Sequence, residues 1–266
     1  MIFLPASQKV AQFLFATGIA GFGIQHLILR NFIAGRPLPM QGEGNPILAI
    51  AIGTGILLLA TAITVIICKK AFPFLISTAA VIFLWSFLRY IPVIIGRPAF
   101  DGTVTAAGKA LAVTGSCLIL ASCFRDTLQN PGRWAWLRVT GLVFIGLFLI
   151  ASGIQHFIYI DFVAQLVPSW VPAPVFWAYF AGIALIAAGM GLTIAKTRKI
   201  SGTLAALMIF VWMIILHIPR VVTMHDANEW TSLMETMVFS SGLFIGANQI
   251  IERRAESVLQ VNCFDF

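Results

Sequence analysis

Charged residues are scarce in this sequence. Asp, Glu, Lys and Arg together make up 10% of its 266 residues, whereas 59% are hydrophobic. In a soluble globular protein, about a quarter of the residues are charged. So many apolar side chains cannot be hidden in a core of ordinary surface-to-volume ratio, so the surrounding solvent must be lipid. The composition therefore excludes a soluble enzyme, a nucleic-acid-binding module and a disordered chain.

Cysteine pairs with a redox or haem-attachment spacing are also absent. The four cysteines form neither C-x-x-C nor C-x-x-C-H, which excludes a dithiol redox motif and attachment of a c-type haem. A cleavable leader is not expected, because the apolar run after Lys9 is about 20 residues long and lacks an A-x-A end. We interpret this run as a retained transmembrane helix.

Long apolar runs account for most of what is present. Eight segments are each close to the ~20 residues that a spanning helix needs. They cover roughly residues 10–29, 47–67, 72–95, 105–124, 138–160, 175–195, 200–221 and 232–251. The sequence therefore predicts an all-α, polytopic membrane protein with eight transmembrane helices.

Basic residues are distributed unevenly between the two sides of this layout. Eleven Lys and Arg fall on the side of the two termini, and six fall on the other side. Because short cytoplasmic connections are enriched in Lys and Arg, both termini are expected in the cytoplasm. The net charge of +7 has the same origin and does not indicate a nucleic-acid partner.

Two motifs that occur twice indicate an internal repeat. The tetrapeptide G-I-Q-H occurs at 23–26 and again at 153–156, and W-x-x-x-x-x-x-P begins at Trp85 and again at Trp212. We therefore expect two four-helix bundles, a first unit covering about residues 1–130 and a second unit covering about 131–266. Since four is an even number, both units would enter the membrane in the same direction, related by a pseudo-two-fold axis along the membrane normal.

Polar and ionisable residues gather on the outer side of this layout, and the second unit has the more complete set. Such groups cost about 2.5–3.5 kcal/mol each within a bilayer on insertion scales, so a cluster of them suggests a site. Bonding between helices explains such residues equally well. The candidate site residues are His156, His217 and Glu235 as catalytic groups, and Arg220, Arg89, His26, Gln155, Trp177, Trp212 and Trp170 as binding groups.

The connection between the fifth and sixth segments, residues 161–174, contains three prolines. Proline interrupts a helix, so no regular helix is expected through the whole connection. Trp170 and Trp177 fit the aromatic belt found at the level of lipid headgroups. We interpret the connection as an interfacial anchor, with a lid over an outer cavity as the alternative.

Several motifs of the second unit also suggest a family. They are G-I-Q-H-F, V-P-S-W-V-P-A-P-V-F-W, W-x-x-x-L-H-I-P-R and E-W-T-S-x-x-E, and they are spread over residues 138–250. In these motifs the second unit resembles the DoxX family of small four-helix membrane proteins. The first unit resembles it more faintly, with Tyr90 in place of a histidine. The resemblance implies a bacterial cytoplasmic membrane and an association with membrane redox complexes, because relatives of the family include a subunit of a thiosulfate:quinone oxidoreductase.

The leading functional hypothesis is a quinone-associated redox subunit with its site at the outer face. His156 and His217 would exchange protons with the quinone, because imidazole titrates near neutral pH. Arg220 would stabilise an anionic oxygen, and Glu235 would hold a histidine tautomer or accept a proton. Trp177 and Trp212 would form the walls of an apolar slot.

Three alternatives stay open. A non-enzymatic membrane anchor or assembly subunit would dock a periplasmic or membrane partner and needs no cofactor motif. A carrier for a lipid or small solute would fit tandem units about a pseudo-two-fold axis, although the polar residues are expected at the outer face and not mid-membrane. A b-type haem or a metal ion would require His26, His156 and His217 to converge, and no metal site is predicted.

Overall fold

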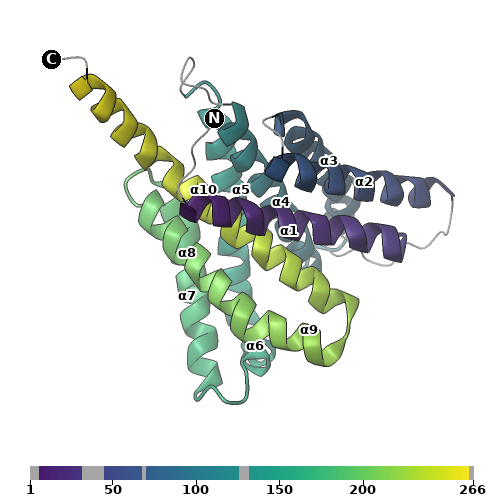
Figure 1. Ribbon diagram of the computed structural model, residues 1–266. Helices are drawn as coiled ribbons and strands as arrows, with labels where there is room; N and C mark the ends of the chain where they lie inside the picture. Colours follow the sequence, from purple (N-terminus) through teal and green to yellow (C-terminus); the bar gives the residue numbers. More distant parts are fainter. Residues whose placement is uncertain (1–5, 32–44, 68–69, 126–131, 264–266) are drawn as a thin grey trace.

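The computed structural model describes residues 6–31, 45–67, 70–125 and 132–263, and these ranges contain helices and no strand (Figure 1). The unit boundary expected at residue 130 lies outside the described residues. The helices are α1 (Ala6–Leu29), α2 (Asn45–Ile67), α3 (Phe72–Gly96), α4 (Gly102–Arg125), α5 (Ala135–Ile158), α6 (Ile160–Leu166), α7 (Pro174–Thr193), α8 (Arg198–Trp212), the π-helix η1 (Met213–His217), α9 (Ile218–Met224) and α10 (Ala227–Cys263).

Within the described ranges, seven spans are long and apolar enough to cross a membrane. They are α1 to α5, α7, and the continuous rod of α8, η1 and α9, which covers Arg198–Met224. The chain is therefore a multi-pass helical membrane protein, and seven of the eight predicted segments are confirmed. The eighth segment, 232–251, lies within α10, which does not qualify, so a total of eight spans stays a prediction.

α10 is less apolar than the seven spans, and other helices cover its central part. Nearly all side chains from Thr231 to Gln249 are buried, including polar ones such as Glu235 and Ser241. Polar side chains in membrane proteins face the interior of the bundle, where neighbouring helices supply their partners. A central helix of this kind needs no continuous apolar surface.

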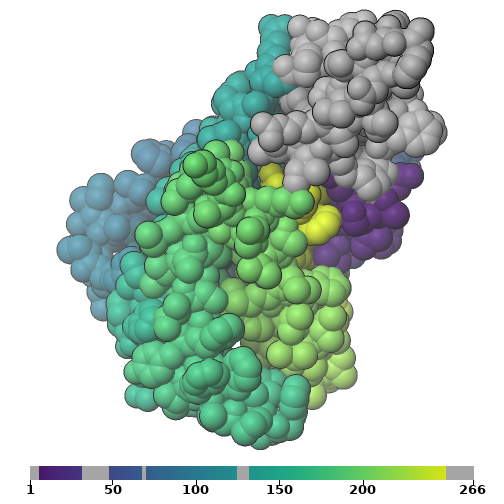
Figure 2. Space-filling view, turned by 90° about the vertical axis from the view of Figure 1, so that its left-hand side faces the viewer, coloured from purple at the N-terminus to yellow at the C-terminus, as the bar shows by residue number. Residues whose placement is uncertain are grey.

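The outer helices show the opposite pattern, with large apolar side chains on the surface. On α7 and α8 these include Phe180, Ile183, Leu204 and Leu207. Figure 2 turns this face, coloured green, toward the viewer. Exposed apolar surface of this extent fits a lipid environment.

α4 and α10 occupy the middle of the molecule. α1 packs against α2 and α10, α5 packs against α4 and α7, and α8 packs against α7 and α10. In Figure 1, α1 and α2 run across the view, α5 and α7 run down it, and α10 passes diagonally between the two groups. The two groups of helices are therefore strongly inclined to each other.

α4 and α10 run in the same direction. Lys109 bonds Glu235 near the start of both helices, and Ser122 Oγ lies 3.3 Å from Gln249 Oε1 further along both. Two helices whose contacts follow the same order along both chains must be parallel. The starts of α4 and α10 therefore lie on the same side of the molecule.

Glycines allow the closest approaches between helices. A Cβ added to Gly153 would lie 2.7 Å from Gly182 O, so α5 and α7 touch backbone to backbone. A Cβ added to Gly23 would likewise lie 3.0 Å from Gly55 O, at the crossing of α1 and α2. Lipid offers little hydrophobic drive between helices, so close van der Waals packing at small residues must supply the contact. The glycine of each G-I-Q-H motif thus sits at a helix crossing.

The proline-rich connection starts as a short helix and then loses helical form. α6 ends at Leu166, before Pro168, and α7 begins at Pro174 after a left-handed Ala173 (φ 56°). The prolines therefore end the helix, as expected from the sequence.

Candidate functional site

The second G-I-Q-H motif joins the end of α5 to the start of α4. Gln155 Nε2 donates to Asp101 O (2.8 Å), and Thr105 Oγ1 donates to Gln155 Oε1 (2.7 Å). Thr103 N–H donates to Asp101 Oδ1 (2.8 Å), and this bond holds the pKa of the Asp101 carboxyl below its usual value. Gln155, predicted as a binding residue, therefore has both ends of its amide engaged by the protein.

The first G-I-Q-H motif makes the corresponding contacts at the start of α10. Gln25 Nε2 donates to Ala227 O (3.2 Å), and Gln25 Oε1 lies 3.5 Å from Thr231 Oγ1, whose proton has a shorter bond to Ala227 O (2.9 Å). Because α4 and α10 are parallel, both motifs lie on the same side of the molecule. We call this side the outer side, following the orientation expected from the basic residues.

His156 presents an open hydrogen-bond acceptor next to an aromatic face. Its Nδ1–H donates to Ser152 O (2.8 Å), one helical turn earlier. A carbonyl oxygen can only accept, so the neutral ring carries its lone pair on Nε2. Nε2 has no bonding partner among the described residues, and the ring stacks on Trp212, with centroids 6.4 Å apart and planes at 18°.

His217 lies on the same rod as Trp212, at the end of the π-helix η1. The π geometry is visible in the bond from Ile218 N–H to Met213 O, which spans five residues. Pro219 lacks an N–H and cannot continue the α-helical ladder, which favours such an irregular turn. Single π turns inside helices are frequent at functional sites. The structure thus joins two of the predicted residues, His156 and Trp212, and places His217 one turn further on.

Arg220 is already paired with a carboxylate. Its Nε and Nη2 donate to the two carboxylate oxygens of Glu229 at 2.9 and 2.7 Å, which ties α9 to the first turn of α10. Such a bidentate pair is among the stronger charge-assisted contacts. The predicted role of Arg220 toward an anionic oxygen would require it to leave Glu229.

Glu235 is likewise engaged, by a residue absent from the predicted site. Lys109 Nζ donates to Glu235 Oε2 (2.6 Å), and the two side chains are 18% and 2% exposed. Lys109 lies 126 residues before Glu235, close to the spacing of the repeated motifs. That spacing is the sequence signal that could have identified Lys109 as the partner.

The remaining predicted residues lie in separate places. His26 is completely buried, and its Nδ1–H donates to a backbone carbonyl of its own helix. Arg89 has buried Nε and Nη1 atoms without an acceptor among the described residues. Trp170 and Trp177 are exposed near the proline-rich connection, as an interfacial anchor requires.

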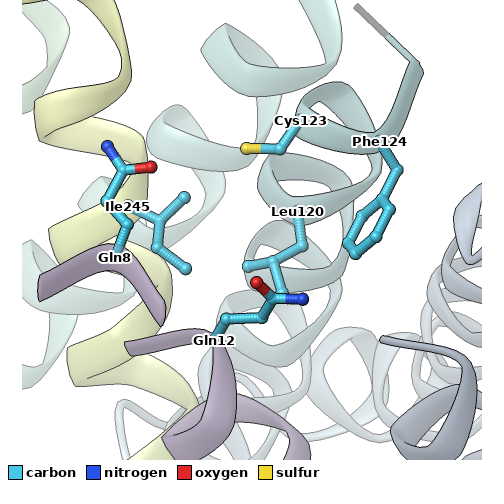
Figure 3. A pocket seen from close by; sticks show the side chains of 6 residues that line it. All are labelled: Gln8, Gln12, Leu120, Cys123, Phe124 and Ile245. Carbon is cyan, nitrogen blue, oxygen red and sulfur yellow. The ribbon is translucent and has the colours of Figure 1, made fainter. Parts of the chain in front are cut away.

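Figure 3 shows a small pocket at the opposite, inner end, between α1, α4 and α10. Gln8 and Cys123 point toward one another across it. Its cavity volume is about 10 Å³, far below the ~300–1,000 Å³ of small-molecule sites. We therefore assign this pocket no ligand. In the described part of the chain, no three His, Cys, Asp or Glu side chains are grouped so that they could hold a metal ion.

The fold and these contacts define a multi-pass helical membrane protein with polar clusters at the outer ends of its central helices. A family described as a domain of unknown function (DUF8561) matches residues 145–239 of the chain. No curated protein and no solved structure matches the chain.

The resemblance to the DoxX family is wrong. The family that matches the region carrying the resemblance is DUF8561, and DoxX does not match. The structure gives a physical reason, because the motif glycine Gly153 serves a helix crossing and Gln155 ties two helices together. Packing features of this kind can recur in unrelated membrane bundles. The redox association implied by the resemblance therefore loses that basis.

Proposed function

We propose that the chain is a tandem pair of four-helix units, residues 1–130 and 131–266, inserted in the same direction with both termini in the cytoplasm. The contacts of the two G-I-Q-H motifs support this arrangement. Gln25 and Gln155 each donate to a carbonyl and contact a threonine at the start of the last helix of the other unit. Those threonines, Thr105 and Thr231, are also 126 residues apart. Equivalent residues making equivalent contacts are what a pseudo-two-fold axis requires.

We propose that the outer side of the second unit binds a lipid-like molecule with a hydroxyl group, of the quinol type, in a bacterial cytoplasmic membrane. The observation that carries this proposal is the open Nε2 of His156 beside the ring of Trp212. A lone pair on Nε2 accepts a hydrogen bond from a hydroxyl, and a flat aromatic ring offers an apolar face to a quinol ring. The chain would supply the binding site and a proton acceptor, and a partner subunit of a membrane redox complex would take the electrons.

Binding of a short-chain quinol to the purified protein in nanodiscs tests the proposal. We expect His156→Ala to weaken binding at least about tenfold, equal to about 1.4 kcal/mol, because a hydrogen bond at membrane depth is lost. His225→Asn is the matched control, since His225 is exposed and has a left-handed backbone (φ 51°) that Asn tolerates. Unchanged affinity in both His156→Ala and His217→Ala would contradict the proposal.

A second candidate is a non-enzymatic membrane anchor or assembly subunit. The pairing of Arg220 with Glu229 and of Lys109 with Glu235 favours it, because residues predicted for chemistry are engaged in bonds within the protein. Retention of full quinol affinity by the histidine variants would leave this candidate in place of the first. The carrier hypothesis has no specific contact in its favour and stays a prediction.

A further inference from the structure

The contact between α4 and α10, which we call the seam, joins positions that are equivalent in the proposed tandem arrangement. Lys109 touches Glu235 and Ser116 touches Gly242, and the members of each pair are 126 residues apart. A Cβ added to Gly242 would lie 2.7 Å from the Cβ of Ser116. A position that touches its own equivalent lies on a two-fold axis, so the seam would contain the axis.

Lys109 and Glu235, which meet on the proposed axis, carry opposite charges. Two copies of the first unit would place Lys109 against Lys109, and two copies of the second would place Glu235 against Glu235. The Glu235 side chain is only 2% exposed, so little water would screen such a pair. Like charges held together without water repel strongly. The ion pair at this position therefore favours contact between unlike units.

The contacts on either side of the seam are complementary in size. The Met234 side chain of α10 lies over Gly21 of α1, and a Cβ added to Gly18, one turn earlier, would lie 2.9 Å from the Met234 carbonyl oxygen. The Phe148 side chain of α5 lies over Gly108 of α4. Gly18 and Phe148 are 130 residues apart, the spacing of the G-I-Q-H motifs, and Gly108 and Met234 are 126 residues apart. The bulky residue is therefore on the last helix at one contact and on the first helix of a unit at the other.

Pairing of like units would destroy this fit. Two second units would place Phe148 where Gly18 packs against the Met234 backbone at both contacts, which overfills the space. Two first units would place Gly18 and Gly21 against Gly108, which leaves a gap. Overpacking and cavities both destabilise a packed interface. Charge and size therefore select the same pairing by independent means.

We infer that the seam is an interaction surface specific for the unlike unit of the same chain. Each unit accepts the other and rejects a copy of itself, so the chain closes on itself and does not assemble with a second copy through this surface. The inference rests on the proposed tandem arrangement, and it is independent of the quinol site, which uses other residues.

Charge exchange across the seam in the full chain tests the inference. Lys109→Glu alone and Glu235→Lys alone each place like charges on the axis and are expected to lower the melting temperature in detergent by about 10 °C. The double variant Lys109→Glu/Glu235→Lys is expected to recover most of that loss, because equivalent positions offer equivalent surroundings. A buried pair in unlike surroundings would not tolerate the exchange, so a double variant as unstable as the single ones would overturn the inference.

An exchange of size provides the second test. Gly108→Met alone is expected to lower the melting temperature, because Phe148 occupies the space, with its Cδ2 2.9 Å from a Cβ built on Gly108. Adding Phe148→Gly and Ala151→Gly, at the positions equivalent to Gly18 and Gly21, copies the arrangement of these two glycines against Met234 and is expected to restore stability. No recovery would overturn the inference. Quinol affinity, measured on the same proteins, reports separately on the proposed function.

Discussion

Several polar side chains inside this protein bond across helices. Gln25, Gln155, Lys109 and Glu235 each reach a partner on another helix, and these contacts concentrate near the starts of α4 and α10. An unsatisfied polar group is costly away from water, so each such residue specifies which helices meet. His156 is different, because its Nε2 is left open.

The first prediction concerns Gln155, which bonds both Asp101 O and Thr105 Oγ1. Gln155→Ala is expected to cost about 1–2 kcal/mol of stability, because bonds between α5 and α4 are lost. Thermal unfolding in detergent measures the change. Gln165→Ala is the control, since Gln165 is exposed on α6. Equal melting temperatures for the two variants would show that the contact stabilises nothing.

The helices are joined by glycine crossings as much as by polar contacts. Along α5 and α7, two glycine pairs allow backbone contact, at Gly153 with Gly182 and at Gly146 with Gly189. A larger residue at such a level must push the helix axes apart, since backbone atoms cannot move aside as side chains can. The close spacing of α5 and α7 therefore depends on glycine, which has no Cβ, at these positions.

Gly189→Ala is expected to destabilise the protein by about 1–3 kcal/mol, because the new Cβ would lie 2.6 Å from Gly146 O. The matched control is Gly53→Ala, because Gly53 lies in α2 with no atom near its Cβ position. Alanine there is expected to be neutral or to stabilise by up to about 1 kcal/mol, since it favours the helix. Chemical denaturation of both proteins measures the difference. Equal effects at both positions would contradict the assigned role of the crossing.

At the scale of the whole molecule, two inclined groups of helices share the central pair α4 and α10 (Figure 1). The contacts of Lys109 with Glu235 and of Ser122 with Gln249 show that this pair is parallel. The C-terminal ends of α1 and α5, which carry the G-I-Q-H motifs, therefore lie on the same side of the molecule. The basic residues then predict which side faces the cytoplasm.

Labelling of single cysteines in intact cells tests this orientation, in a chain whose natural cysteines are replaced by serine. Ser169→Cys, in the proline-rich connection, is expected to react with a membrane-impermeant maleimide from outside. Lys196→Cys, in the basic connection between α7 and α8, is expected to react only after permeabilisation. Both positions are exposed, so access depends on the side of the membrane. The reverse pattern would contradict the predicted orientation.

Much of the architecture was predictable, because hydropathy is a local property of the chain. A run such as residues 72–95 must lie in lipid or in a core wherever it folds, so seven spans could be located from composition alone. α10 was harder, since its polar residues are acceptable only where other helices cover them. The functional role of the candidate site residues stays a prediction, because residue types at helix ends indicate polarity and not partners. The DoxX resemblance failed for a related reason, since motifs that serve packing do not specify a family.

The sequence by itself determined that this protein is helical, resides in a membrane and repeats two short motifs. Only the tertiary structure decided that Lys109 pairs with Glu235, that Gln155 binds the start of α4 and that His156 stacks on Trp212. These contacts join residues 50 or more positions apart. They depend on the register and crossing of packed helices, and no short stretch of sequence encodes either.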